Sequence, residues 1–363
     1  MSLSRRSFLH ATACAAPFIW TRRYAHAESL NVQIGRMLMA NFTGITAGPE
    51  SPIARLIQRD RLGGVLLLEN NFSGAVHPKA SLKRLCSDLQ SLSNSPVLIA
   101  MDQEGGLVNR LKPKYGFPPT WSAQELGAQN DPQRTHDAAD TIARSLAELG
   151  INFNFAPVVD IRLNPTNPVV GRTQRCFGER ADTVVRHAAA FVRAHRQHRI
   201  ITTLKHFPGH GSSASDSHHG LTDVTATWRE IELQPYRQLI KAGLADAVMT
   251  AHIFNRNWDE RHPASLSRAV VQSTLRQTLG FDGVVISDDL LMGAIREFYT
   301  LEESVLLAIN AGVDILLFTT IANDLIPNVQ QIIRDHVRAG RISRVRIAEA
   351  NRRIQRVTNR LRI

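Results

Sequence analysis

Several features that define other protein classes are scarce or absent in this 363-residue chain. It has 3 cysteines, too few for a disulfide-stapled scaffold or a zinc module built on cysteines. No apolar run approaches the roughly 20 residues that a helix needs to span a bilayer. Internal repeats and low-complexity linkers are also missing, so nothing marks a boundary between two domains. Hydrophobic residues make up 43% of the chain and charged residues 21%, which is typical of a globular protein.

The first 27 residues are organised like an export signal. Ser4-Arg5-Arg6-Ser7-Phe8-Leu9 matches the twin-arginine pattern, a weakly apolar stretch follows, and Ala25-His26-Ala27 fits a cleavage site. We therefore predict that residues 1–27 are removed during twin-arginine export and that residues 28–363 form the mature, periplasmic protein. The leader contributes four arginines and no acidic residue, so its removal lowers the formal charge from +11 to +7. No helix-turn-helix or comparable module accompanies the remaining charge, and we expect no nucleic-acid partner.

Short apolar segments alternate with helical patterns along the mature chain. Strands are expected at Met37–Ala40, Gly64–Leu68, Val97–Met101, Asn152–Pro157, Ile200–Leu204, Ala247–Thr250, Val284–Ser287 and Ile315–Phe318. Helices are expected from Pro132 to about Leu149 and near 181–198, 229–242, 266–279, 301–311, 322–338 and 343–361. Because the strand segments are continuously apolar, they indicate a sheet that is covered on both faces.

Eight such strands, each followed by a helical or loop segment, predict a single-domain (β/α)8 TIM-type barrel. A doubly wound open sheet is the alternative. That fold usually carries a glycine-rich nucleotide fingerprint in its first strand-to-helix turn, and this chain has none there.

Polar residues follow five of the predicted strands, at the end where barrel enzymes carry their chemistry. They are Asp102-Gln103-Glu104-Gly105-Gly106 with Arg110, then Asp160, the segment Lys205–Gly211 with Asp216–His219, then His252, and Ser287-Asp288-Asp289. Each alone is compatible with a structural hydrogen bond at a strand end. Their convergence on one face of a barrel indicates an active site.

The segment 206–219 contains four histidines, so a metal site has to be considered. Metal-binding barrels usually place an H-x-H pair on a strand, and this pair is missing. His206 and His210 have the spacing of a helical metal pair, but Pro208 and Gly209 argue against a helix there. We therefore expect no metal and no cofactor.

Carbohydrate hydrolysis fits these residues better. A retaining glycosidase needs a carboxylate nucleophile and an acid/base group on opposite sides of the scissile bond. Asp288 is a carboxylate at the end of a buried strand, and Asp216-x-His218 lies on a Gly/Ser-rich loop. Histidine exchanges protons near neutral pH, and a neighbouring aspartate would orient its ring. The residues alone thus predict a barrel hydrolase with a His–Asp dyad, with a glycosidase as one possibility.

The segment K-H-F-P-G-H-G followed by D-S-H, from Lys205 to His218, resembles the signature of the bacterial β-N-acetylhexosaminidases of glycoside hydrolase family 3. Three other segments agree in order: D-Q-E-G-G from Asp102, N-F-A-P-V-V-D from Asn154, and S-D-D-L-x-M from Ser287. The resemblance covers essentially the whole mature chain and implies the single-barrel branch of the family.

The resemblance also implies roles for individual residues. Asp288 matches the nucleophile, with Asp289 as the competing candidate, while His218 matches the acid/base group and Asp216 its partner. The residues that match the sugar-binding set are Asp102, Arg110, Lys205, His206 and an arginine near position 175. We choose Arg175, with Arg172 as the alternative, because R-T-Q-R-C-F stands where the family usually has R-S-F. His210, Asp160, His219 and His252 are left unassigned.

The predicted function is exo-acting, retaining hydrolysis of terminal N-acetylglucosamine from peptidoglycan- or chitin-derived glycans, by a protein that is expected to be a monomer. One alternative is a phosphorylase of the same family, which phosphate dependence would reveal. The others are a catalytically silent glycan-binding protein and a metal-dependent hydrolase.

Overall fold

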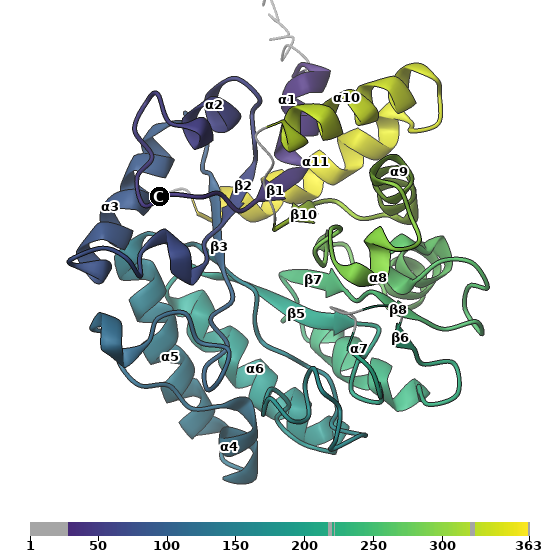
Figure 1. The fold of residues 1–363 in the computed structure, drawn as a ribbon. Coiled ribbons are helices and arrows are strands. Elements are labelled where there is room, and N and C mark those ends of the chain that lie inside the picture. The colour runs from purple at the N-terminus through teal and green to yellow at the C-terminus, as the bar shows by residue number, and fades with distance from the viewer. Residues whose placement is uncertain (1–27, 217–219, 221, 320–323, 362–363) are drawn as a thin grey trace, which may run out of the picture.

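The computed structural model describes residues 28–216, 220, 222–319 and 324–361. The predicted leader, 1–27, lies outside the described residues, and so do His218 and His219. Figure 1 shows the described chain as one body of strands surrounded by helices.

Eight parallel strands form the sheet at the centre of the molecule. They are β1 (Leu38–Ala40), β2 (Gly64–Leu66), β3 (Leu98–Met101), β4 (Phe153–Asn154), β5 (Ile201–Phe207), β7 (Ala247–Thr250), β9 (Val284–Ser287) and β10 (Leu316–Phe318). Their spatial order is β10-β1-β2-β3-β4-β5-β7-β9. A parallel bridge between Ile286 and Ile315 brings β9 next to β10, so the ring is nearly closed. This confirms the predicted (β/α)8 barrel.

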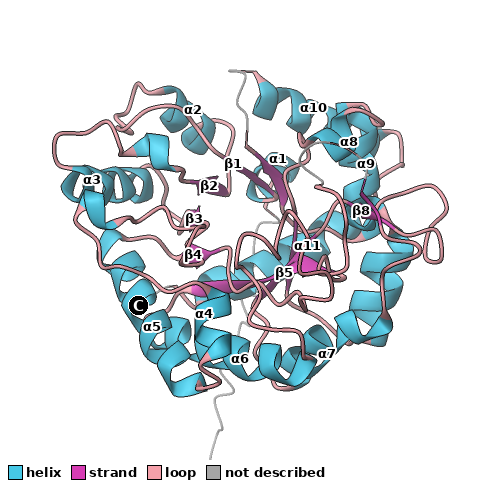
Figure 2. Ribbon diagram, turned by 60° about the horizontal axis from the view of Figure 1, so that its bottom comes forward, coloured by secondary structure: helices cyan, strands magenta, loops and turns pink. Residues whose placement is uncertain are grey.

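Helices surround the ring of strands, as Figure 2 shows. They are α1 (Leu30–Arg36), α2 (Pro52–Gln58), α3 (Pro78–Ser91), α4 (Ala123–Ala128), α5 (Pro132–Leu149), α6 (Ala181–Gln197), α7 (Gln234–Lys241), α8 (Gly293–Arg296), α9 (Leu301–Ala311), α10 (Leu325–Arg338) and α11 (Arg344–Asn359). The α5 helix illustrates how the sequence sets its limits. The Asp131 side chain accepts from the Gln133 amide at its start, and Gly150 ends it with a φ of 84°.

The structure departs from the expected elements in several places; the strand expected at Asn152–Pro157, for example, is confined to Phe153–Asn154. The strand expected to stop at Leu204 continues to Phe207, so Lys205 and His206 lie inside β5 instead of beyond it. The helix expected near 266–279 is a short 3₁₀ turn, η4 (Ala264–Leu266), followed by the π-helix η5 (Ala269–Thr278). A small parallel sheet of β6 (Thr222–Asp223) and β8 (Ile253–Phe254) was not predicted, because two-residue strands leave no periodic pattern.

Buried ion pairs attach the outer helices to the amino ends of the strands. Asp246, next to β7, bonds Arg196 of α6 at 2.7 Å and Arg360, just beyond α11, at 2.6 Å. Asp314, before β10, bonds Arg276 of η5 at 2.6 Å and Arg346 of α11 at 2.7 Å. The carboxylates are 1% and 0% exposed, so these two residues fix the carboxyl-terminal helix against the barrel.

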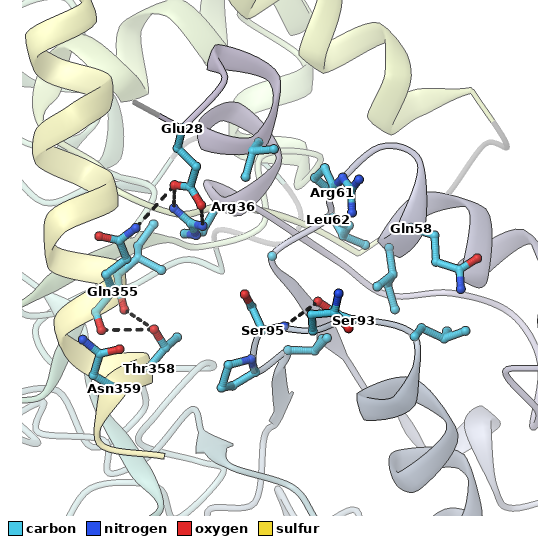
Figure 3. A pocket seen from close by; sticks show the side chains of 18 of the residues that line it. Glu28, Arg36, Gln58, Arg61, Leu62, Ser93, Ser95, Gln355, Thr358 and Asn359 are labelled. Atoms are coloured by element: carbon cyan, nitrogen blue, oxygen red, sulfur yellow. Dashed lines mark hydrogen bonds and ion pairs between the residues drawn. The ribbon is translucent and has the colours of Figure 1, made fainter. Parts of the chain in front are cut away.

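A cavity of about 550 Å³ lies at this amino end, between α1, the segments that precede β2 and β3, and the end of α11. We call it the amino-end cavity. Figure 3 shows Glu28 reaching Arg36 and Gln355 at its edge, with an Arg36 Nη1 to Glu28 Oε2 distance of 2.6 Å. The described part of the chain therefore starts at the amino end of the barrel. Within the described residues, no helix is both long and apolar enough to cross a membrane.

Candidate active site

A second cavity, of about 400 Å³, opens at the carboxyl ends of the strands. We call it the site cavity. Its polar lining consists of Asp102, Arg110, Thr173, Arg175, Lys205, His206, Asp216, Asp288, Asp289 and Thr319. Leu66, Leu68, Phe155, Met249, Met292 and Leu317 contribute apolar surface. This combination of an apolar wall with a few convergent polar groups is typical of a small-molecule site.

An ion-pair network centred on Glu104 forms one wall of the site cavity. The Glu104 carboxylate accepts two hydrogen bonds of 2.8 Å from Arg175 and also pairs with Lys205 at 2.7 Å. Lys205 in turn lies 2.8 Å from Asp102, whose other oxygen is 3.8 Å from Arg110. Burial alone would raise the pKa of Glu104, but Arg175 and Lys205 outweigh it and hold that pKa well below its usual range. Glu104 therefore stays ionised and holds both cations in place.

His206 is oriented by a second buried carboxylate. Asp160, which is 1% exposed, accepts from the His206 amide at 3.3 Å and lies 2.7 Å from its Nδ1. The opposite ring nitrogen, Nε2, is 3.2 Å from Arg175 Nη2. Burial would raise the pKa of Asp160, but the charge and hydrogen bond of His206 lower it overall. Asp160 thus fixes the direction in which the His206 ring points.

The two carboxylates after β9 have different surroundings. Asp289 Oδ1 accepts from the amides of Leu291 at 3.0 Å and Thr319 at 3.1 Å, and Oδ2 accepts from the Thr319 hydroxyl. Burial raises the pKa of Asp289. Asp288 is half-buried, and its backbone amide donates to the Thr250 carbonyl of β7 at 3.1 Å.

This hydrogen bond between the Asp288 amide and the Thr250 carbonyl continues the pairing of β9 with β7 past the end of β9. Both oxygens of the Asp289 carboxylate thus accept hydrogen bonds from Thr319. Asp288 lines the site cavity from the end of β9.

The loop that leaves β5 brings Asp216 to the same cavity. His210 and Gly211 at its start are buried, and the chain becomes exposed at Ala214 and Ser215. Burial, followed by the charge of His206, lowers the pKa of His210 to about 4, so its ring is neutral at working pH. His218 follows Asp216 by two residues and lies outside the described part of the chain.

The described residues that we predicted for the site line one cavity: Asp102, Arg110, Arg175, Lys205, His206, Asp216 and Asp288. Arg172 is exposed and is not among the lining residues. His252 instead bridges Ser265 at 2.7 Å and the Asp289 carbonyl at 2.8 Å, which is a packing role. In the described ranges, no group of three or more His, Cys, Asp or Glu side chains is arranged to hold a metal ion.

Glu104 and Asp160 were both among the polar residues that follow the predicted strands, but the sequence predicted no role for either. Glu104 stands two residues after Asp102 in the D-Q-E-G-G segment. In an extended chain, side chains two residues apart point to the same side. The spacing of Asp102 and Glu104 was therefore the feature of the sequence that could have placed Glu104 at the site. Asp160 ends the N-F-A-P-V-V-D segment, but nothing in the sequence shows that it contacts His206, 46 positions away.

The fold is of the (β/α)8 class, and the site cavity lies at the carboxyl ends of the strands, where enzymes of this class carry their active sites. The sequence profile of the glycosyl hydrolase family 3 N terminal domain matches residues 29–357. The chain belongs to glycosyl hydrolase family 3. This confirms the predicted family and the predicted enzyme class, a glycoside hydrolase.

Relatives within the family carry more specific names. The chain is 32% identical to beta-hexosaminidase A of Pseudoalteromonas piscicida over 85% of its own length and 55% of that protein. It is 34% identical to the beta-hexosaminidase of Tolumonas auensis over 72% of its length and 77% of that protein. A family 3 beta-N-acetylglucosaminidase from Paenibacillus sp. superposes with a TM-score of 0.85 at 36% identity, over 92% of this chain and 63% of that one. The chain therefore spans between about half and three quarters of the length of these proteins.

Proposed function

We propose that the protein is an exo-acting, retaining β-N-acetylglucosaminidase that removes terminal N-acetylglucosamine from peptidoglycan- or chitin-derived glycans. The observation that carries this proposal is the joint presence of Asp288, Asp216 and the Asp102–Lys205 pair in one cavity. A retaining glycosidase needs a nucleophilic carboxylate, a proton-transfer group and a rigid binding set for one sugar. Asp288 can supply the first and the Asp102–Lys205 pair belongs to the third, while Asp216 would be the partner of the proposed acid/base group, His218. The names of the relatives support the choice of sugar.

The binding set would hold the non-reducing sugar by its hydroxyl groups. A carboxylate such as Asp102 can accept from two adjacent hydroxyls, and Lys205, Arg110 and Arg175 can donate to others. Glu104 strengthens this set, because it pairs with both Lys205 and Arg175 and so limits their movement. The side chains would therefore be arranged before the sugar arrives, which lowers the conformational entropy lost on binding.

Two steps would complete the reaction. First, Asp288 attacks the anomeric carbon to form a glycosyl ester, while His218 protonates the leaving oxygen. The neutral form of His218 then takes a proton from water, which attacks the anomeric carbon and releases the sugar and the Asp288 carboxylate. Asp216 would orient the His218 ring and stabilise its protonated form. Two inversions return the β configuration to the product.

We also propose that residues 1–27 direct the protein through the twin-arginine route to the periplasm, where glycan fragments of the cell wall are available. The motif Ser4-Arg5-Arg6-Ser7-Phe8-Leu9 and the Ala25-His26-Ala27 site support this proposal. We expect a monomer without a cofactor and with no partner other than the glycan.

A panel of aryl N-acetylglucosaminides and glucosides tests the function. We expect hydrolysis of the N-acetylglucosaminides, a β-configured initial product by NMR, and a rate that does not depend on phosphate. An α-configured product would contradict retention. Sugar 1-phosphate formed on addition of phosphate would indicate a phosphorylase, whereas binding of oligosaccharides without any turnover would indicate a silent glycan-binding protein. Loss of activity with a chelator would indicate a metal-dependent hydrolase.

A further inference from the structure

The loop that carries Asp216 is held at its start by two carboxylates from different parts of the chain. The His210 amide donates to Asp160 Oδ1 at 2.8 Å. The next amide, that of Gly211, donates to Glu232 Oε2 at 3.0 Å. Two consecutive backbone N–H groups are thus fixed by side chains that lie 72 positions apart and flank the loop in sequence.

The loop backbone packs against Glu232 without any space for a side chain. Gly209 has a φ of +116°, and a Cβ atom added to it would lie 2.5 Å from the Cβ of Glu232. A Cβ atom on Gly211 would lie 1.7 Å from the Ile161 carbonyl oxygen. Real Cβ atoms do not approach other atoms so closely, so glycine is required at both positions. The start of the loop is therefore confined between Ile161 and Glu232.

Glu232 is itself held firmly. It lies in the 3₁₀ helix η3 (Glu230–Leu233), immediately before α7, and is 1% exposed. Its Oε1 atom accepts from the Arg229 amide at 3.3 Å, while Oε2 accepts from Gly211. Each oxygen therefore accepts from one backbone N–H, and that of Gly211 is buried. An ionised carboxylate suits this arrangement because both of its oxygens are acceptors.

The far end of the loop lines the site cavity. Between the two ends, the Ser213 carbonyl accepts from the Asn164 side chain at 2.8 Å, and the Gly211 carbonyl accepts from the Asn164 amide at 3.0 Å. Asp216 follows Gly211 by five residues. Asn164 thus ties Gly211 to Ser213, and two residues lead from Ser213 to Asp216. We therefore expect a displacement at Gly211 to move Asp216.

We propose that Glu232 is a positioning residue for the reaction, because its carboxylate fixes Gly211 and thereby sets where Asp216 enters the site cavity. The inference rests on the proposed function, in which Asp216 orients the acid/base group. Glu232 does not line the cavity, so it acts through the loop and not on the sugar.

The protonation state of Glu232 bears on this role. Burial raises the pKa of Glu232 to about 7, the Ser212 hydroxyl opposes the rise, and the charge of Asp160 adds to it. Tyr236 of α7 also interacts with Glu232, and burial raises the pKa of this phenol, so it stays neutral. Protonation of Glu232 at low pH would replace one acceptor with an O–H donor facing a backbone N–H. The loop is therefore held best above about pH 7.

The Glu232→Gln variant tests the proposal, because glutamine has the same shape but only one acceptor oxygen. It cannot satisfy both the Gly211 and the Arg229 amides. Glu230→Gln is the matched control: Glu230 belongs to the same η3 helix, but its side chain is 78% exposed. Both variants would be made in the full chain and compared with the unmodified protein by hydrogen exchange and by kinetics.

We expect faster hydrogen exchange in the peptides that cover residues 209–216 of Glu232→Gln and no change in Glu230→Gln.

The kinetics of Glu232→Gln should change as well. With an aryl N-acetylglucosaminide, kcat should fall about tenfold, the size expected for the loss of one hydrogen bond to a buried donor. KM should stay within about twofold, because Asp102 and Lys205 keep their contacts. The decrease in kcat should be larger for poor leaving groups, which depend more on protonation. In the unmodified protein kcat should fall as the pH drops through about 7, and Glu232→Gln should lack this acidic limb.

Unchanged exchange and unchanged kcat in Glu232→Gln would overturn the proposal, and so would equal effects in both variants. A chain that hydrolyses none of the tested glycosides would refute the proposed function instead. In that case hydrogen exchange would still decide whether Glu232 fixes the loop, and a loop with the same exchange in all three proteins would refute this role as well.

Discussion

The two ends of the barrel use the same kinds of side chain in different ways. At the amino end, Asp246 and Asp314 each bind at least two arginines and are 1% and 0% exposed. At the carboxyl end, the Asp102 side chain is 21% exposed and pairs closely with one cation, Lys205. The carboxylates of the amino end are thus saturated, whereas Asp102 retains surface that a ligand can reach.

This difference separates stability from chemistry within one fold. The saturated aspartates connect β7 and β10 to outer helices, so their ion pairs are part of the folded framework. Glu104 combines both roles, because it is buried and fully paired yet holds Arg175 and Lys205 at the wall of the site cavity. Barrel enzymes generally divide their two ends in this way. Substitutions should therefore affect activity at one end and stability at the other.

The largest expected effect is at the carboxyl end. Replacing Asp288 by alanine should lower kcat for an aryl N-acetylglucosaminide by about 10⁴-fold, because Asp288 is the carboxylate that would form the proposed covalent intermediate. The thermal unfolding midpoint should change little, since Asp288 is only half-buried. Initial rates and a thermal melt of the same preparation measure both quantities.

Azide distinguishes Asp288 from its neighbour. In Asp288→Ala, added azide can enter in place of the carboxylate and should restore turnover, with an α-glycosyl azide as the product. Asp289→Ala should not yield this product, because Asp289 is bound to Thr319 and Leu291. If the azide product came from Asp289→Ala alone, the nucleophile would have to be reassigned.

Much of this arrangement could be predicted from the sequence, because the strands have a simple physical signature. Ala247–Thr250 and Val284–Ser287 are short apolar segments that a covered parallel sheet requires, and their predicted limits agree with the structure. The π-helix at Ala269–Thr278 could only be expected as an ordinary helix, since the apolar spacing does not distinguish the two over so few turns.

The site was predictable to the extent that its residues follow strands. Asp102 and Asp288 each come directly after an apolar segment, which places them at one end of a barrel. The contacts of Asp160 with His206 and of Glu232 with Gly211 depend on how distant segments pack, and one sequence carries no signal for them. That Arg175 lines the site cavity and Arg172 does not likewise depends on the geometry of the loop after β4.

At the amino end we expect an effect on stability instead of activity. Asp246→Asn should lower the free energy of unfolding by about 2 to 3 kcal/mol, because Arg196 and Arg360 lose their shared carboxylate. The kcat of the folded fraction should be unchanged. Chemical denaturation combined with active-site titration measures the two separately. A loss of kcat with normal stability would contradict the division between the two ends.

The same variant has a defined pH dependence. Burial would raise the pKa of Asp246, but Arg360 and Arg196 outweigh it and lower that pKa below its value in the unfolded chain. The charge of Asp246 therefore stabilises the fold above about pH 4 and ceases to do so as pH falls through the lowered pKa. The stability difference between the unmodified protein and Asp246→Asn should accordingly shrink below about pH 4.

The smallest expected effect on stability comes from an exposed aspartate, Asp282, that pairs with two arginines of α11. Asp282 bonds Arg353 at 3.0 Å and Arg356 at 2.8 Å, which repeats the arrangement of one aspartate with two arginines found at Asp246. Its side chain, however, is 61% exposed, so water already solvates the carboxylate and salt screens the pair. Asp282→Asn should lower the free energy of unfolding by less than about 1 kcal/mol, and less again at high salt. If Asp282→Asn and Asp246→Asn were equally destabilising, burial could not be the reason why the saturated aspartates stabilise the barrel.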